Sequence, residues 1–442
     1  MASRCAGGGI LDVVAWAERF IATPSVSRDG NAGIAQCARE LLAEAGLEAR
    51  LLPTDLDGVT HYTLIADAGP PPGDAGDGLL LLTHLDTVPP GDPAAWTATG
   101  SDPWNPVRDG DRLYGLGSAD AKVDLVCKAA ALAEVDLGAL RRPLRVVGTF
   151  AEEIGLVGAR ELVRSGGVRG FRSALVGEPS ELTGIVAHKG YAVFRAAVPL
   201  TPLGDAPAGA ERLDFCGEAA HSSTPQLGRN AIYRALDRLD DPDVRGLLAL
   251  EGGGAVNVVP GHCSLTISSE AAGHDPQPVR AFYRAWRGLL EDLAERRSPD
   301  FDPDHSVGSL GRVELEAGRA MFTFDLRPIP GVDPEQAVAV LASVAEIELV
   351  RANPPLETAL DTPLVEAVEA AQQAVGLGRR IATKATCTEA GLLSQAGLDA
   401  VVFGAGPSVG NVHRPNEYTR VPELAQARDL YRHVIAHLCG EG

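Results

Sequence analysis

The sequence predicts an α/β protein, built on a mixed, mostly parallel sheet flanked by helices, with an α+β domain inserted into it. Three segments carry this prediction: 79–90 (LLLLTHLDTVPP), 145–153 (RVVGTFAEE) and 173–180 (SALVGEPS). In each one, a buried or β-rich run ends in a histidine or a carboxylate, and helical patterns separate the runs. Open α/β sheets bind ligands at the carboxyl ends of their strands, so these polar residues mark the expected site.

The remaining elements of this first domain follow from periodicity and from its breakers. Apolar residues at helical spacing, stopped by proline or glycine, predict the helices 10–21, 34–45, 123–137, 159–163, 364–375 and 424–438. Short β-prone runs predict the additional strands 49–52, 62–66 and 400–403.

The pattern changes at His188, where alternating apolar and polar residues indicate antiparallel strands. The strands expected after it are 191–200, 213–216, 255–259, 263–268, 319–326 and 346–350, with helices at 230–239, 279–296 and 334–345. We therefore expect a metal-binding catalytic domain of residues 1–186 and 355–442, and an inserted domain of residues 187–354.

Composition narrows the class of protein. The chain has 442 residues, is 45% hydrophobic and carries a net charge of −20, which excludes the basic surfaces that nucleic acids and anionic membranes require. The seven cysteines are scattered and form no C-x-x-C pair, as is typical of reduced intracellular thiols. We expect a cytoplasmic protein without a signal peptide or a membrane span.

Collecting the polar residues at the strand ends gives a candidate metal centre. They are His84, Asp120, Glu152, Glu153, Glu178 and His413. Imidazoles and carboxylates without thiolates suit zinc or a neighbouring divalent metal, and two ions sharing one carboxylate would activate a water molecule. A carboxylate that binds no metal is then needed to move the proton, and the adjacent Glu152 and Glu153 offer that division of roles.

Each of these residues also has a simpler explanation when it is taken alone. His84 with Asp86 is a common turn at a strand end, and paired glutamates favour a helix N-terminus. Glu178 before a proline is an ordinary turn, and a lone His413 is more often a surface residue. The order of the motifs in one βαβ layout favours the metal centre.

The motifs also resemble a known family. HLDTVP at 84–89, GSADAK at 117–122, TFAEE at 149–153 and GEPS at 177–180 occur in the order typical of the M20 metallopeptidases and deacylases. The resemblance spans roughly residues 23–437 and implies a zinc-exopeptidase-like catalytic domain with an inserted lid and dimerisation domain. It also implies two zinc ions per subunit, with cobalt or manganese as alternatives. The implied ligands are His84 and Glu178 for one ion, Glu153 and His413 for the other, and Asp120 as the bridge.

The resemblance assigns roles to five further residues. It implies Glu152 as the general base and Asp86 as a carboxylate that orients or tunes His84. His221 matches a lid histidine that polarises the scissile carbonyl, from the other subunit in family dimers, and Asn257 matches a lid residue that contacts substrate. Arg327 matches the arginine that clamps the substrate carboxylate; without the resemblance, an arginine paired to a neighbouring aspartate on the sheet is as good an interpretation.

The branch most resembled is acetylornithine deacetylase, on AHKG at 187–190, CTEA at 387–390 and HRPNEY at 413–418. We expect removal of an N-acyl group, acetyl in the first instance, from an amino acid, by a homodimer formed through the inserted domain. Glu389 is either a contact for a cationic substrate side chain or a helix-start glutamate. The alternatives are a carboxypeptidase or dipeptidase, a succinyl-diaminopimelate desuccinylase-like enzyme, and a non-catalytic ligand-binding member.

Two departures from the family pattern are visible. The usual Asp-Met-Lys-Gly-Gly is DAKVD at 120–124, which removes two glycines beside the expected bridging ligand. A Pro/Gly/Ala-rich stretch at 201–210 lengthens the connection between His188 and His221.

Overall fold

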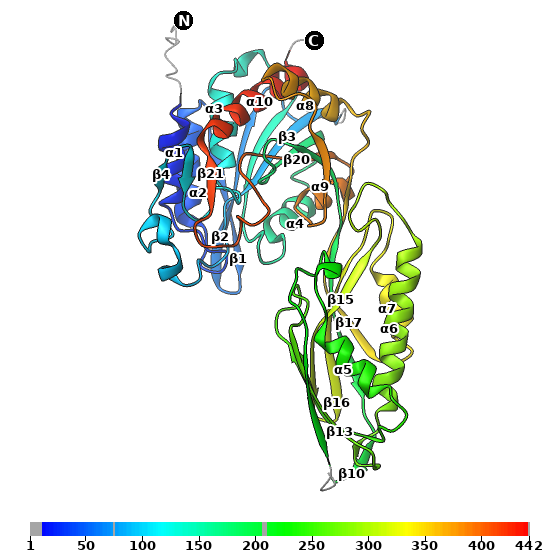
Figure 1. The fold of residues 1–442 in the computed structure, drawn as a ribbon. Coiled ribbons are helices and arrows are strands. Elements are labelled where there is room, and N and C mark those ends of the chain that lie inside the picture. Colours follow the sequence, from blue (N-terminus) through cyan, green and yellow to red (C-terminus); the bar gives the residue numbers. More distant parts are fainter. Residues whose placement is uncertain (1–10, 74–75, 206–209, 441–442) are drawn as a thin grey trace, which may run out of the picture. The chain divides into compact units, whose positions relative to one another are not determined.

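The computed structural model describes residues 11–73, 76–205 and 210–440, and the chain divides into two compact units (Figure 1). Unit 1 comprises Met1–Ala187, Leu356–Ala382 and Thr388–Gly442, and unit 2 comprises His188–Pro355 and Thr383–Cys387. These units differ from the expected bounds at Ala187 and Pro355, by one residue each, and in 383–387, which groups with unit 2. The start of the first predicted helix and residues 206–209 of the long connection lie outside the described residues, as do residues 1–10 of the N-terminal stretch from which no signal peptide is expected.

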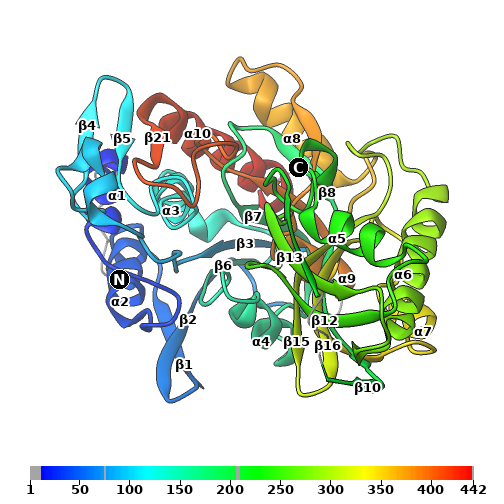
Figure 2. The same ribbon diagram turned by 60° about the horizontal axis from the view of Figure 1, so that its bottom comes forward.

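The sheet of unit 1 has a parallel centre and antiparallel edges. Its strand order is β1-β2-β6-β3-β7-β20-β8-β18, and β3 pairs in parallel with both β6 and β7, while β7 pairs in parallel with β20. Figure 2 shows β6, β3 and β7 side by side. The strand bounds are β1 Ala49–Leu56, β2 Val59–Ala68, β3 Gly78–His84, β6 Leu144–Thr149, β7 Phe171–Gly177, β8 Gly184–His188, β18 Leu356–Glu357 and β20 Asp399–Phe403.

Helices cover both faces of this sheet. Alternate residues of β3 divide between two cores: Leu79 and Leu81 pack with α1, α2, α3, α8 and α10, whereas Leu80 and Leu82 pack with α4 and α9. All seven residues of β3 are buried, which explains its run of four leucines without alternation. The helices are α1 Val13–Ile21, α2 Ala32–Glu44, α3 Asp124–Ala133, α4 Val157–Arg164, α8 Pro363–Ala374, α9 Ala390–Gln395 and α10 Val421–Cys439.

Unit 1 also contains a second, smaller sheet. A small antiparallel sheet joins β4 Val107–Asp109, β5 Arg112–Tyr114 and β21 Tyr418–Arg420, and so ties the segment after β20 to the segment before α3. This pairing brings residues about 300 positions apart in the sequence to one place, which the order of the motifs alone does not predict.

Unit 2 is an antiparallel sheet packed against helices, as the alternating pattern predicts. The strand order is β10-β14-β12-β15-β16-β9-β17, with β13 joining β11 to β12. The strands are β9 Tyr191–Pro199, β10 Pro202–Gly204, β11 Glu211–Cys216, β12 Gly246–Gly253, β13 His262–Ser268, β14 Gly273–His274, β15 Val307–Glu316, β16 Arg319–Arg327 and β17 Glu346–Asn353.

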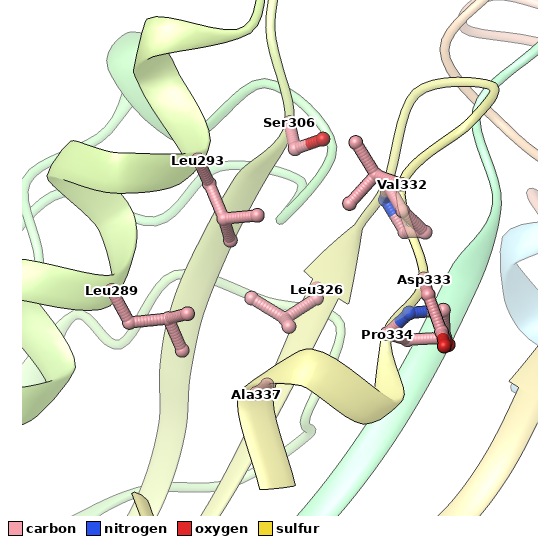
Figure 3. Close-up of a pocket in the computed structure, with 9 residues that line it drawn as sticks. Leu289, Leu293, Ser306, Leu326, Val332, Asp333, Pro334 and Ala337 are labelled. Atoms are coloured by element: carbon pink, nitrogen blue, oxygen red, sulfur yellow. The ribbon is translucent and has the colours of Figure 1, made fainter. Parts of the chain in front are cut away.

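Three helices, α5 Ala231–Leu239, α6 Gln277–Glu295 and α7 Glu335–Leu341, lie in unit 2. Phe282 and Trp286 of α6 pack on Phe322 and Phe324 of β16, with ring centroids 4.5 and 4.8 Å apart. Between α6, α7 and β16 remains a cavity of about 10 Å³, lined mainly by leucine, valine, proline and alanine (Figure 3). That volume is at the lower limit for one water molecule, so this gap binds no substrate.

One predicted strand is wrong. Residues 255–259 form a turn, and the strand in this region is β12, which ends at Gly253. A Cβ on Gly253, which has φ +74°, would lie 2.0 Å from the Gly311 carbonyl oxygen, so this glycine permits both the turn and the close approach. Within the described residues, no helix is long and apolar enough to cross a membrane.

Candidate metal centre

The carboxyl ends of the central strands of unit 1 carry the predicted metal-binding residues. His84 is the last residue of β3 and Glu178 directly follows β7. Glu153 follows β6, His413 lies in the loop between β20 and β21, and Asp120 lies in the loop before α3. Because β6, β3, β7 and β20 are neighbours in the sheet, their ends bring these side chains to one edge.

Asp120 lies between two imidazoles. Its Oδ1 is 3.1 Å from His84 Nε2, and its Oδ2 is 3.2 Å from His413 Nε2. Glu178 Oε1 is 3.7 Å from the His84 nitrogen, and Glu153 Oε2 is 3.0 Å from the His413 nitrogen. The two oxygens of one carboxylate thus face two different groups of donors.

These donors form two sets that share Asp120. The potential ligand atoms of His84, Asp120 and Glu178 lie within 4.8 Å of one another, and so do those of Asp120, Glu153 and His413. Mixed imidazole and carboxylate donors fit zinc and its neighbours. The five residues predicted as ligands are therefore brought together, in two donor sets that have Asp120 in common.

The cluster contains more carboxylates than imidazoles. Burial opposes protonation of His413, but its contacts with Asp120 and Glu153 outweigh burial and raise its pKa to about 11. Burial raises the pKa of Glu153, and the charge of Asp120 adds to the effect. Imidazoles that hold protons tightly and carboxylates that resist ionisation both indicate a place where divalent cations would stabilise the charges.

Glu152 is available as a carboxylate outside the two donor sets that share Asp120. Burial raises its pKa well above the usual range for glutamate, and the nearby charges of Glu153 and Glu178 act in the same direction. Together with Glu153 it also lies within 4.8 Å of a His84 donor atom. Its position beside both sets is the one a proton-transfer group requires.

Asp86 holds the turn that presents Glu152 and Glu153. Its Oδ1 accepts the backbone N–H of Glu152 at 3.1 Å and its Oδ2 accepts that of Glu153 at 3.3 Å, while the Ser27 hydroxyl donates to Oδ2 at 2.6 Å. His84 Nδ1 lies 3.1 Å from the backbone oxygen of Asp86 and 3.7 Å from its carboxylate. The closest hydrogen-bonded support of His84 is therefore the peptide oxygen, and the carboxylate chiefly orders the glutamate turn.

Glu417, which the sequence shows only as part of the HRPNEY motif, contacts the loop that carries Asp120. Its Oε1 accepts the backbone N–H groups of Ala119 and Asp120 at 2.8 and 3.0 Å, and its side chain is buried. Burial raises its pKa to about 7. A glutamate 297 residues away in sequence thus fixes the loop that carries the shared carboxylate.

Glu389 lies in the residue before α9 and is fully buried. Both of its carboxylate oxygens are buried, as is the hydroxyl of Thr149. Burial raises the pKa of Glu389 to about 8, while His84 and a hydrogen bond from Thr149 act in the opposite direction. A buried carboxylate is costly to keep, and for Glu389 the substrate contact and the helix-start glutamate both stay predictions.

His221 and Asn257 meet within unit 2. The backbone N–H of Ser222 donates to the Asn257 carbonyl oxygen at 3.0 Å, and His221 forms a bridge with Val258. The backbone N–H of Ser223 donates to His221 Nδ1 at 3.1 Å, so the neutral ring carries its proton on Nε2. The His221 side chain is exposed.

Arg327 is anchored inside unit 2. Its Nε donates to Asp325 Oδ2 at 3.1 Å, one terminal nitrogen donates to the Ser222 hydroxyl at 2.9 Å, and its guanidinium lies 3.9 Å from the ring centre of Tyr191. Only 4% of the residue is exposed. These contacts fit the alternative interpretation, an arginine paired to a neighbouring aspartate on the sheet. The hydrogen bond to Ser222 also connects Arg327 to the residue that follows His221.

The chain matches the family described as Peptidase family M20/M25/M40 over residues 80–437. It is similar to acetylornithine deacetylase of Myxococcus xanthus, with 29% identity over 440 residues, 95% of this chain and 96% of the relative. The acetylornithine deacetylase of Photorhabdus laumondii is 27% identical over 439 residues, again 95% of this chain and 96% of the relative.

Solved structures agree on the fold. The aminoacylhistidine dipeptidase of Vibrio alginolyticus has a TM-score of 0.70 at 17% identity and covers 97% of both chains. The M20 family metallo-carboxypeptidase Sso-CP2 of Sulfolobus solfataricus has a TM-score of 0.63 at 18% identity, covering 97% of this chain and 99% of that one. At identities this low, the likeness shows the fold alone.

Proposed function

The chain belongs to peptidase family M20/M25/M40 and is a metal-dependent hydrolase of amide bonds, and from that premise we propose that it removes an N-acetyl group from an amino acid with a cationic side chain. The substrate would be a small N-acyl amino acid of the acetylornithine type. The curated relatives named above support the deacetylase over a dipeptidase.

The observation that carries the proposal is the position of Asp120. With one oxygen toward His84 and the other toward His413, its carboxylate suits a bridge between two divalent ions, for which we propose zinc, with cobalt or manganese as alternatives. Ions held there would lower the pKa of water and polarise the acyl carbonyl. Glu178 and Glu153 would complete the two sets of ligands.

Within this proposal Glu152 is the general base. Its carboxylate takes a proton from the attacking water and returns it to the nitrogen of the leaving amine. Asp86 contributes by fixing the backbone of the turn on which Glu152 stands. The protonated Nε2 of His221 is the proposed donor to the oxygen of the acyl group, and Asn257 a proposed substrate contact.

Two assignments concern the rest of the substrate. Glu389 is the proposed partner of a cationic side chain, supported by the full burial of its carboxylate. Arg327 is the proposed clamp for the α-carboxylate; this assignment rests on the resemblance, since Asp325 and Ser222 already engage two of its nitrogens. A homodimer through unit 2 and a cytoplasmic location also remain proposals, and light scattering of the purified protein tests the first.

A substrate panel tests the proposed function. We expect hydrolysis of N-acetylornithine with a kcat/KM well above those for N-acetylmethionine, succinyl-diaminopimelate and neutral dipeptides. Turnover restricted to dipeptides would replace the deacetylase by a dipeptidase, and preference for the succinylated substrate would replace it by a desuccinylase.

A Glu152→Gln variant separates an enzyme from a non-catalytic binding protein. Its kcat should fall about 10²- to 10⁴-fold while the metal content stays that of the parent protein. Glu357→Gln, in β18 of the same unit, is the matched control because its side chain is exposed. Unchanged activity in Glu152→Gln at full metal content would rule out the proposed base.

A further inference from the structure

A buried ion pair lies behind the strand ends that carry His84 and Glu178. Asp124 and Lys128 stand one turn apart in α3, with Lys128 Nζ 2.7 Å from Asp124 Oδ2. The side chains are 0% and 4% exposed for Lys128 and Asp124 respectively. A fully buried pair of charges is stable only when hydrogen bonds satisfy both charges. The hydrogen-bond partners of Lys128 and Asp124 therefore identify the segments that the pair connects.

Lys128 holds the end of β3. Besides the carboxylate of Asp124, its ammonium donates to the Leu82 carbonyl oxygen and to the Thr83 hydroxyl, both at 2.7 Å. The three ammonium hydrogens are thereby used, and two of the acceptors belong to the residues directly before His84. The ammonium thus fixes the backbone from which the His84 side chain projects.

Asp124 bonds β3 and α10 and packs against the end of β7. Its Oδ2 accepts the Thr83 hydroxyl at 2.9 Å and its Oδ1 accepts the Tyr431 hydroxyl of α10 at 2.6 Å. A Cβ on Gly177 would lie 2.0 Å from Asp124 Oδ2, so the carboxylate fills the space beside Gly177, the residue before Glu178.

Replacing a buried pair by apolar side chains is often neutral for stability, so the pair contributes mainly defined geometry. Here its contacts converge on the residues next to two proposed ligands. We propose that Asp124 and Lys128 are positioning residues for the metal site formed by His84, Asp120 and Glu178, through their contacts with Thr83, Leu82 and Gly177. The inference rests on the proposed metal centre and goes beyond it, because neither residue is a ligand.

Cobalt(II) titrated into the metal-free protein tests this. The parent protein should show two binding events per chain by calorimetry and by visible absorption. Thr83→Val keeps the shape of the side chain and removes the hydroxyl shared by Lys128 and Asp124. In this variant, and in Lys128→Met, we expect one event to weaken at least tenfold with an altered spectrum, while the other event is retained.

Thr358→Val is the matched control, because it removes another buried threonine hydroxyl of the same unit, one that bonds Ala400 instead of a residue next to a ligand. It should bind cobalt as the parent protein does. If Lys128→Met does not fold, Thr83→Val decides alone.

Equal weakening of both events, or weakening no greater than in Thr358→Val, would overturn the positioning role. A parent protein that binds no cobalt would instead refute the proposed metal centre.

Discussion

Replacing Glu389 by glutamine should stabilise the metal-free protein in a pH-dependent way. The carboxyl group is fully buried, and burial raises its pKa from the reference value of 4.5 to about 8. Between those two values the unfolded chain has released the proton while the folded chain retains it. The free energy of unfolding therefore falls as the pH rises through this window, and levels off above pH 8.

The magnitude follows from the width of the window. At pH 7, about 2.5 units above the pKa in the unfolded chain, ionisation stabilises the unfolded state by about 3 kcal/mol. At pH 5 the same ionisation stabilises it by less than about 1 kcal/mol. Glutamine does not ionise, so Glu389→Gln should be more stable than the parent protein by those amounts. Urea unfolding in EDTA at pH 5, 6, 7 and 8 measures the difference, with Glu357→Gln as the control for an exposed glutamate. A difference that does not grow with pH would refute the argument.

The remaining predictions concern the site and unit 2. Asp120→Ala should remove both cobalt-binding events, because both donor sets include its carboxylate; one intact event would show that the carboxylate is not shared. Asp86→Ala should lower kcat by about 10- to 100-fold at unchanged KM, since the turn of Glu152 and Glu153 loses its acceptor; a change in KM alone would contradict this. Arg327→Leu should cost about 3–5 kcal/mol in urea unfolding by leaving Asp325 buried without its cation, and Asp325→Asn in the same chain should restore part of it.

The parallel centre of unit 1 was predictable because burial on both faces leaves a direct trace in sequence. Four consecutive leucines, without alternation, are typical of a strand that is buried on both faces. His84 is the last residue of that strand. The strand bounds of unit 2 were harder to predict. The strand β12 carries glycines at its end, and the apolar run after it, expected as a strand, is the turn that Gly253 allows.

The ligand candidates could be found because each one sits in a local motif. The residues that hold them could not, because their partners are distant in sequence. Glu417 reaches Asp120 across 297 residues and Tyr431 reaches Asp124 across 307. Asp124 appeared in the sequence only as the loss of a glycine beside the expected bridge, whereas in the fold its carboxylate packs where Gly177 leaves room.

The proposed mechanism requires Asp120 to bind two metal ions at once. Anomalous diffraction at the zinc absorption edge, from crystals grown with zinc, would locate these ions. We predict two peaks, each about 2 Å from a different oxygen of Asp120, one beside His84 and Glu178 and the other beside Glu153 and His413. A single peak, or two peaks that do not share Asp120, would rule out the proposed bridge.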